Sequence, residues 1–350
     1  MARVGDDFIR APLEGLLGLI YKRARSRADL MIAAYNGHGT NRRMHVQGRV
    51  LVNKLLLPPS PRDSAWKNFR NTAKRFLSAE IEGALIRGTF AGQSLNAYTD
   101  SEGFFNLTFH RDVPLPFEGW QPVYLELLHP SPIPPVSAQG KIWVVNDPEY
   151  GVISDIDDTV LHSDVAFRME VFLASVFKNA HTRLPLEGVS EFYQRLVEGT
   201  GVRSPNPIFY VSNSPWNMYD VLVDFFRIHG IPEGSLFLRD WSLRSIHESQ
   251  GRHKRNIIER ILATYPKLDF ILIGDSGEKD PEIYRDIALS LAHRGRIRAI
   301  YIRSVRSKNP ERQREVQELA DQLAQRGVDM QLVASTEAAV EHARRSLFIR

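Results

Sequence analysis

The chain has 350 residues, a formal net charge of +4 and no cysteine. Its length favours two domains over one, and the missing cysteine excludes disulfides, zinc–thiolate sites and cysteine nucleophiles. The small net charge gives no case for nucleic-acid binding, and no apolar run reaches the length of a membrane-spanning helix. Glu14 interrupts the apolar stretch near the N-terminus, which is not the pattern of a signal peptide, so we expect a cytoplasmic protein.

Residues 1–29 are predicted to contain an amphipathic helix, over about 8–27. Apolar side chains recur at i, i+3, i+4, i+7 spacing, at Leu13, Leu16, Leu17 and Ile20. Basic residues follow, at Lys22, Arg23, Arg25 and Arg27. Such a helix can lie on an anionic lipid surface or pack on the body of the protein with its basic end facing water. The second interpretation is favoured, because helices of that kind are common in soluble domains.

Residues 30–148 have the pattern of a β-rich domain. Short runs of alternating apolar and polar residues, separated by turn residues, predict strands near 43–52, 81–90, 93–98, 104–109, 123–128 and 141–145. A helix is expected at 63–77. This spacing predicts a β-sandwich-like domain of unknown role, and the turn at 99–105 resembles the one in small prealbumin-like sandwich modules. The segment 37–40, Gly-His-Gly-Thr, is compatible with a binding loop, but a simple glycine turn is the favoured interpretation.

Residues 149–350 show a different rhythm, in which apolar strand-like runs alternate with helical segments. Strands are predicted at 151–156, 208–211, 236–238, 270–273, 297–302 and 331–333. Helices are predicted between them, at 167–177, 189–198, 218–229, 254–265, 281–294 and 310–326. This pattern predicts an α/β domain with a doubly wound parallel sheet. Sites in such sheets form at the carboxyl ends of the strands.

The first candidate site residues follow the strand at 151–156 directly. Asp155, Asp157 and Asp158 abut a strongly apolar run, where carboxylates are costly unless something neutralises them. A magnesium ion, which prefers carboxylates, a carbonyl, waters and phosphate oxygens, would do so. A calcium loop is excluded, because the fifth, sixth and twelfth positions counted from Asp155 are Thr159, Val160 and Ala166. The alternative is a solvated acidic turn without a metal, which is disfavoured because the acids directly follow an apolar strand.

Three further pieces lie at predicted strand ends or helix starts. Gly274 permits a sharp turn after the strand at 270–273, and Asp275 and Asp280 can complete a metal site. Ser212 ends the strand at 208–211 with a hydroxyl that can donate to a phosphoryl oxygen. Lys254 opens a predicted helix and can offset the repulsion between a carboxylate and an anionic substrate. The competing cations are Lys279, Arg252 and Arg255, and spacing favours Lys254.

These pieces together are similar to the four ordered motifs of the haloacid dehalogenase-type hydrolase superfamily: Asp155-x-Asp157-x-Thr159, Ser212, Lys254, and Gly274-Asp275 with Asp280. The fuller strings 154–160, 210–216 and 274–284 resemble more narrowly the actin-patch-associated phosphatidate phosphatase family and its bacterial relatives. The resemblance covers about residues 150–310. It implies a haloacid dehalogenase-like Rossmannoid fold and a magnesium-dependent phosphatase. Asp158 stands where many superfamily members have glycine, but the phosphatidate family carries aspartate there.

The resemblance also implies a role for each residue. Asp155 attacks phosphorus to form an aspartyl-phosphate, and Asp157 protonates the leaving oxygen and then activates water. Ser212 and Lys254 hold the phosphoryl group, and Thr159 stabilises the turn after the nucleophile. Separately from these roles, Thr159 and Asn213 are predicted to bind substrate. The implied magnesium ligands are Asp155, Asp157, Asp275 and Asp280.

The substrate is less sharply predicted than the reaction. The insertion between 161 and 206 is too short for a large cap domain, so we expect an open site with a minimal cap, suited to a bulky or surface-presented substrate. The basic N-terminal segment, Arg303, Arg306 and Lys308 are compatible with peripheral binding to a membrane surface. Phosphatidate as substrate is implied by the resemblance alone. The alternatives are a soluble phosphomonoester or phosphoprotein as substrate, or a non-catalytic lipid- or protein-binding module, which the complete acid set disfavours. Oligomeric state is not predicted.

Overall fold

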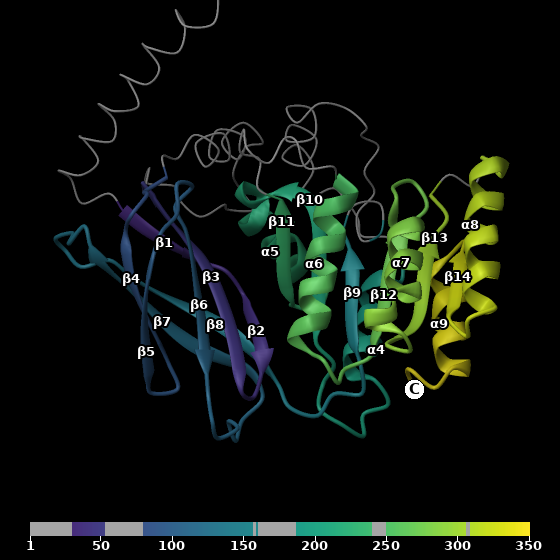
Figure 1. Ribbon diagram of the computed structural model, residues 1–350, viewed down its shortest axis with the longest axis horizontal. Coiled ribbons are helices and arrows are strands. Elements are labelled where there is room, and N and C mark those ends of the chain that lie inside the picture. Colours follow the sequence, from purple (N-terminus) through teal and green to yellow (C-terminus); the bar gives the residue numbers. More distant parts are fainter. Residues whose placement is uncertain (1–29, 53–79, 157–158, 160–186, 240–249, 306–308) are drawn as a thin grey trace, which may run out of the picture. The chain divides into compact units, whose positions relative to one another are not determined.

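The computed structural model describes residues 30–52, 80–156, 159, 187–239, 250–305 and 309–350 (Figure 1). The helices predicted at 8–27, 63–77 and 167–177 lie outside these residues. The chain divides into two compact units, each of several segments. The first comprises Met1–Tyr35, His45–Phe109 and Pro122–Lys141, and the second comprises Asn36–Met44, His110–Gln121 and Ile142–Arg350. The domain boundary expected after residue 148 stays a prediction.

The first unit is built of antiparallel strands. Its strands, some of which continue into segments of the second unit, are β1 (Leu30–Ala34), β3 (Arg43–Val52), β4 (Leu85–Phe90), β5 (Gln93–Tyr98), β6 (Phe104–His110) and β7 (Gly119–His129). The pairs β1·β3, β4·β5 and β4·β7 are antiparallel. Side chains alternate between core and solvent along β4, as a half-buried strand requires. The β-rich prediction for this region is confirmed, while a sandwich-like arrangement stays a prediction.

Strand β2 corrects one interpretation of the sequence. The segment Gly37–Thr40, expected as a glycine turn or binding loop, is a strand that pairs in parallel with β8 (Ser137–Val145). Its His38 lies among the rings of Phe209, Phe237 and Tyr265, with centroid distances of 5.4–5.9 Å. Its Nδ1 lies 3.1 Å from the Tyr265 hydroxyl oxygen. The histidine is therefore part of the packing of the second unit.

A six-stranded parallel sheet forms the centre of the second unit. Its strands are β9 (Gly151–Asp155), β10 (Ile208–Pro215), β11 (Ser235–Arg239), β12 (Phe270–Asp275), β13 (Ile297–Arg303) and β14 (Asp329–Val333). Their order is β11-β10-β9-β12-β13-β14, and each neighbouring pair is parallel (Figure 1). The predicted α/β class with a parallel sheet is confirmed. The chain moves from β9 outward to β11 and returns to β12 on the other side of β9, which creates a switch point at the carboxyl ends of β9 and β12.

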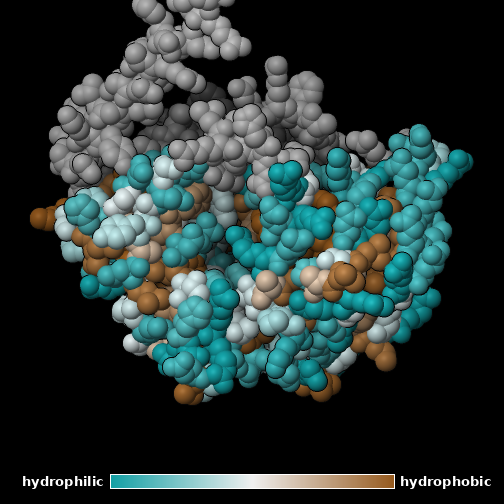
Figure 2. All heavy atoms as spheres, viewed as in Figure 1, coloured by the Kyte–Doolittle hydropathy of each residue, from teal (hydrophilic) through white to brown (hydrophobic). Residues whose placement is uncertain are grey.

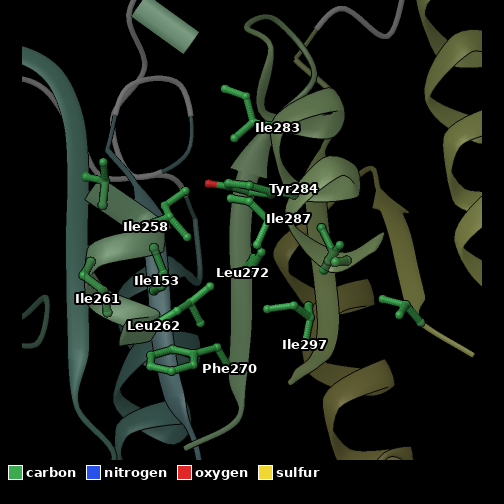
Figure 3. Close-up of a cluster of buried hydrophobic side chains, with 14 of the residues drawn as sticks. Ile153, Ile258, Ile261, Leu262, Phe270, Leu272, Ile283, Tyr284, Ile287 and Ile297 are labelled. Atoms are coloured by element: carbon green, nitrogen blue, oxygen red, sulfur yellow. The ribbon is translucent and has the colours of Figure 1, made fainter. Parts of the chain in front are cut away.

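Helices follow the strands of this sheet, and buried side chains fill the space between them. The helices are α4 (Val189–Glu198), α5 (Tyr219–Ile228), α6 (Gln250–Thr264), α7 (Asp280–Leu289), α8 (Pro310–Ala324) and α9 (Thr336–Arg345). Against one face of the sheet, Ile258 and Leu262 of α6 and Ile287 of α7 lie with Ile153 and Leu272 (Figure 3), and all five are fully buried. Burial of each such side chain contributes roughly 1.5–3 kcal/mol.

The opposite face of the sheet is also covered. The Tyr193 hydroxyl of α4 lies 2.7 Å from Ser154 Oγ on β9, and the Tyr301 ring of β13 contacts Phe192 of α4 and His342 of α9. Because both faces are buried, the strands read as continuous apolar runs and not as an alternation. The outer surface of α8 is hydrophilic (Figure 2). Among the described residues, no helix combines the length and apolar character needed to cross a bilayer.

Candidate functional site

Three aspartates and a lysine converge at the switch point. Asp155 is the last residue of β9, Asp275 the last of β12, Asp280 the first of α7, and Lys254 lies on α6. The pairing of Ser154 with Ile273 brings the two strand ends side by side. One oxygen from each aspartate lies within 4.8 Å of one from the other two. The three aspartates are completely buried and Lys254 is 1% exposed.

Lys254 links the carboxylates of this cluster. Its ammonium donates to Asp155 Oδ1 at 2.9 Å, to Asp280 Oδ1 at 2.5 Å and to Glu278 Oε2 at 3.3 Å. An ammonium has three donors, so each has an acceptor. Burial lowers the pKa of Lys254, but the charges of Asp155 and Asp280 outweigh it and hold the pKa well above its usual value. The lysine is therefore charged, and Lys279, the competing candidate, is exposed.

Asp275 is oriented by the turn that follows it. Its Oδ1 accepts from the backbone N–H groups of Gly277, at 2.5 Å, and Glu278, at 3.0 Å. Its buried Oδ2 has no hydrogen-bond partner among the described residues. Burial, and then the charge of Asp280, raise the pKa of Asp275 to about 7. One ammonium does not neutralise three buried carboxylates, so this set of hard oxygen donors fits a divalent cation such as Mg²⁺.

Gly274 allows the close approach on which this arrangement depends. A Cβ at this position would collide with the Asp280 carboxylate and would lie 2.8 Å from the Tyr284 ring. The Tyr284 hydroxyl donates to the carbonyl of Ile273 at 3.0 Å and ties α7 to the end of β12. Any side chain larger than hydrogen at 274 would therefore push Asp280 away from Lys254.

Ser212 and Asn213 are the other predicted residues that the structure places beside this cluster. Ser212, fully buried, follows Val211, the residue paired with Asp155, and its Oγ accepts from the backbone N–H of Ser214 at 2.9 Å. Asn213 donates through Nδ2 to Glu278 Oε2 at 3.1 Å. Thr159 is buried at 3% exposure, and its hydroxyl has no partner within the described ranges. Asp157 and Asp158 lie outside the residues that the structure describes.

A polar cavity of about 700 Å³ adjoins the cluster. Asn213 and Lys254 line it, together with the 276–279 turn and Arg312 of α8. Sequence reasoning missed Glu278 and Arg312. Glu278 could have been found, because it is a further acid between Asp275 and Asp280. Arg312 carries no local signal, since a basic residue on an exposed helix is ordinary.

Comparison with known proteins shows which proteins the segment that carries this site is similar to. Residues 150–304 match the family described as phosphatidate phosphatase APP1, catalytic domain. The predicted resemblance to this family is confirmed over that segment. The Saccharomyces cerevisiae phosphatidate phosphatase APP1 is 36% identical over 156 residues, which cover 44% of this chain and 25% of that protein. The uncharacterized protein C29B5.04c of Schizosaccharomyces pombe is 30% identical over 159 residues, 45% of this chain and 25% of that protein.

The chain thus spans about a quarter of the length of the curated relatives it matches. Among solved structures, the carbohydrate acetylesterase XAC1771 of Xanthomonas citri matches with 12% identity and a TM-score of 0.28, over 85% of this chain and 66% of that one. A match at this score carries no information about the fold or function of this chain. The sequence match at the APP1 catalytic domain is therefore the comparison that bears on the site.

Proposed function

We propose that residues 149–350 form a magnesium-dependent phosphatase domain of the haloacid dehalogenase type with a minimal cap. The observation that carries the proposal is the buried cluster of Asp155, Asp275, Asp280 and Lys254 at the switch point of a parallel sheet. The match of residues 150–304 to the APP1 catalytic domain supports it, and the haloacid dehalogenase placement is consistent with that family. Buried acids of this kind are costly to folding, which favours a functional over a structural role.

Asp155 is the proposed nucleophile. The Lys254 ammonium, 2.9 Å from its Oδ1, favours the ionised carboxylate that an attack on phosphorus requires. In the first step a carboxylate oxygen of Asp155 forms a bond to phosphorus, and the bond from phosphorus to the alcohol oxygen breaks. Asp157 is the proposed acid that protonates the departing oxygen, and then the base that takes a proton from the water that releases phosphate. Lys254 and Ser212 would hold the phosphoryl oxygens during both steps.

Mg²⁺ would be held by Asp155, Asp275 and Asp280. Asp157, which lies outside the described residues, is the fourth proposed ligand. When bound, the ion supplies positive charge that offsets the charge of the phosphoryl group. Thr159 and Asn213 are proposed to lie on the substrate side. Asn213 fits this role because it lines the polar cavity beside Lys254.

The proposed substrate is phosphatidate, which would be converted to diacylglycerol and phosphate. It is supported by the similarity to the yeast protein named phosphatidate phosphatase APP1. Peripheral attachment to a membrane stays a prediction, because the basic N-terminal segment, Arg306 and Lys308 lie outside the described residues.

The test is phosphate release from phosphatidate in mixed micelles, compared with release from a soluble phosphate ester, with and without Mg²⁺. We expect Mg²⁺-dependent release from phosphatidate. Activity on the soluble ester alone would refute the lipid substrate. Asp155→Asn should abolish turnover on either substrate, and substantial residual activity would rule out the covalent route. Asp269→Asn is the matched control, since Asp269 precedes β12 and forms a surface ion pair with Arg298.

A further inference from the structure

Arg312 contacts the 276–278 turn beside the candidate metal site, and it lies outside the segment that matches the APP1 family. It lies on the first turn of α8, and its side chain is 17% exposed. The Asn309 side chain caps this helix and accepts from the Arg312 N–H at 3.2 Å. The start of α8, and with it the arginine, is thereby held in place.

The guanidinium of Arg312 uses all five of its donors. Nε donates to the carbonyl of Ser276 at 2.9 Å, and one terminal nitrogen donates to the carbonyl of Glu278, also at 2.9 Å. Glu282 accepts from both terminal nitrogens, at 2.5 and 3.1 Å. Glu315 accepts the fifth N–H at 3.0 Å. Because no donor is left over, this arginine is not available to a substrate phosphate, although it lines the cavity.

The two carbonyls that Arg312 holds flank Gly277. The backbone N–H groups of Gly277 and Glu278 are the donors to Asp275 Oδ1. Arg312 therefore fixes the turn that sets the direction of the Asp275 carboxylate. With Oδ1 held by the turn, Oδ2 remains for a cation next to Asp155 and Asp280. The bond to Glu282 on α7 also links α8 to the helix that begins with Asp280.

We propose that Arg312 is a positioning residue for magnesium binding, acting through the 276–278 turn on Asp275. This inference rests on the proposed function, in which Asp275 holds Mg²⁺. A lysine cannot replace the arginine, because three donors on one nitrogen cannot span two carbonyls and a bidentate carboxylate. The role is therefore specific to the planar guanidinium, beyond its charge.

The test measures Mg²⁺ binding without turnover, as the MgCl₂ concentration that gives half of the maximal thermal stabilisation. We expect Arg312→Lys and Arg312→Met to raise this concentration at least tenfold. Arg314→Met, an exposed arginine on the same helix, should leave it unchanged. Glu282→Gln keeps the arginine but weakens its ion pair, so it should raise the half-maximal MgCl₂ concentration by less. This variant tests the proposal if the Arg312 variants do not fold.

Several outcomes separate the two proposals. A lower melting temperature for Arg312→Lys with unchanged Mg²⁺ affinity would mean a purely structural role and would overturn this inference alone. Binding of Mg²⁺ by the wild type without phosphate release from any ester would overturn the proposed function alone. A wild-type protein that binds no Mg²⁺ overturns both. If Arg312→Lys loses activity and a high MgCl₂ concentration restores that activity, the positioning role of Arg312 is supported.

Discussion

The buried ammonium of Lys254 is expected to be worth several kcal/mol to the fold in the absence of metal. Replacing it by methionine keeps most of the volume but removes the cation from between Asp155 and Asp280, whose side chains are 1% and 0% exposed. Removing one partner of a buried ion pair costs about 3–5 kcal/mol, because the other charge is left uncompensated. We expect Lys254→Met to lower the free energy of unfolding by about that amount.

Urea unfolding measures this change, first in EDTA and then in MgCl₂. In the variant the cluster carries more negative charge, so it should bind Mg²⁺ more tightly, and the difference from wild type should shrink when MgCl₂ is present. Lys279→Met is the matched control, since Lys279 is the competing lysine, lies within the 274–280 motif and is exposed. A surface change of that kind should stay within about 0.5 kcal/mol.

Two results would refute the reasoning. One is a loss below about 1 kcal/mol in EDTA, which would mean that the carboxylates do not depend on this cation. The other is an equal loss of unfolding free energy for Lys279→Met, which would identify Lys279 as the lysine of the site. Turnover should fail in Lys254→Met and persist in Lys279→Met, so the same two proteins also decide which lysine serves the phosphate.

Three further predictions concern neighbouring groups. Glu278→Gln should bind orthophosphate roughly tenfold more tightly by calorimetry, because it removes a negative charge that contacts Lys254 and Asn213; weaker binding would mean that Glu278 positions those donors. Gly274→Ala should destabilise the protein to urea by about 1–3 kcal/mol through its clash with Asp280; an unchanged midpoint would contradict the packing. Removing Mg²⁺ with EDTA should lower the melting temperature. If the Mg²⁺ concentration was 100 times its Kd, the loss of stability is about 2.7 kcal/mol. The Asp275→Asn variant should show no such response.

The sequence predicted the acids of the site better than it predicted their surroundings. Asp155 and Asp275 were identifiable because each ends an apolar strand, and that strand pattern is local. Arg312 was not identifiable, and neither was the contact of Glu278 with Lys254, since these contacts depend on side-chain directions across up to 36 and 24 residues of sequence. No periodicity encodes whether a guanidinium reaches two carbonyls on another element.

The error at Gly37–Thr40 has a similar origin. Two glycines in four residues predict a turn, because glycine is unfavourable in strands. The segment is a strand because β8 offers a parallel partner, and because His38 packs among three aromatic rings from later in the chain. Tertiary contacts outweighed local preference there, and a local rule has no access to them.

The buried acid cluster lowers the stability of the metal-free fold, and this cost favours a functional role for the cluster. The pKa of Asp275 rises from 3.8 to about 7 through burial and the charge of Asp280. A carboxyl whose pKa is higher in the folded state stabilises the fold at low pH, and that stability is lost as pH rises from about 4 through 7. At neutral pH, folding of the metal-free protein therefore disfavours the ionised form of the Asp275 carboxyl. Apolar residues would fill the same space without this cost. A fold that keeps three buried carboxylates at a strand switch point is best explained if a cation, with an anionic substrate beside it, compensates them.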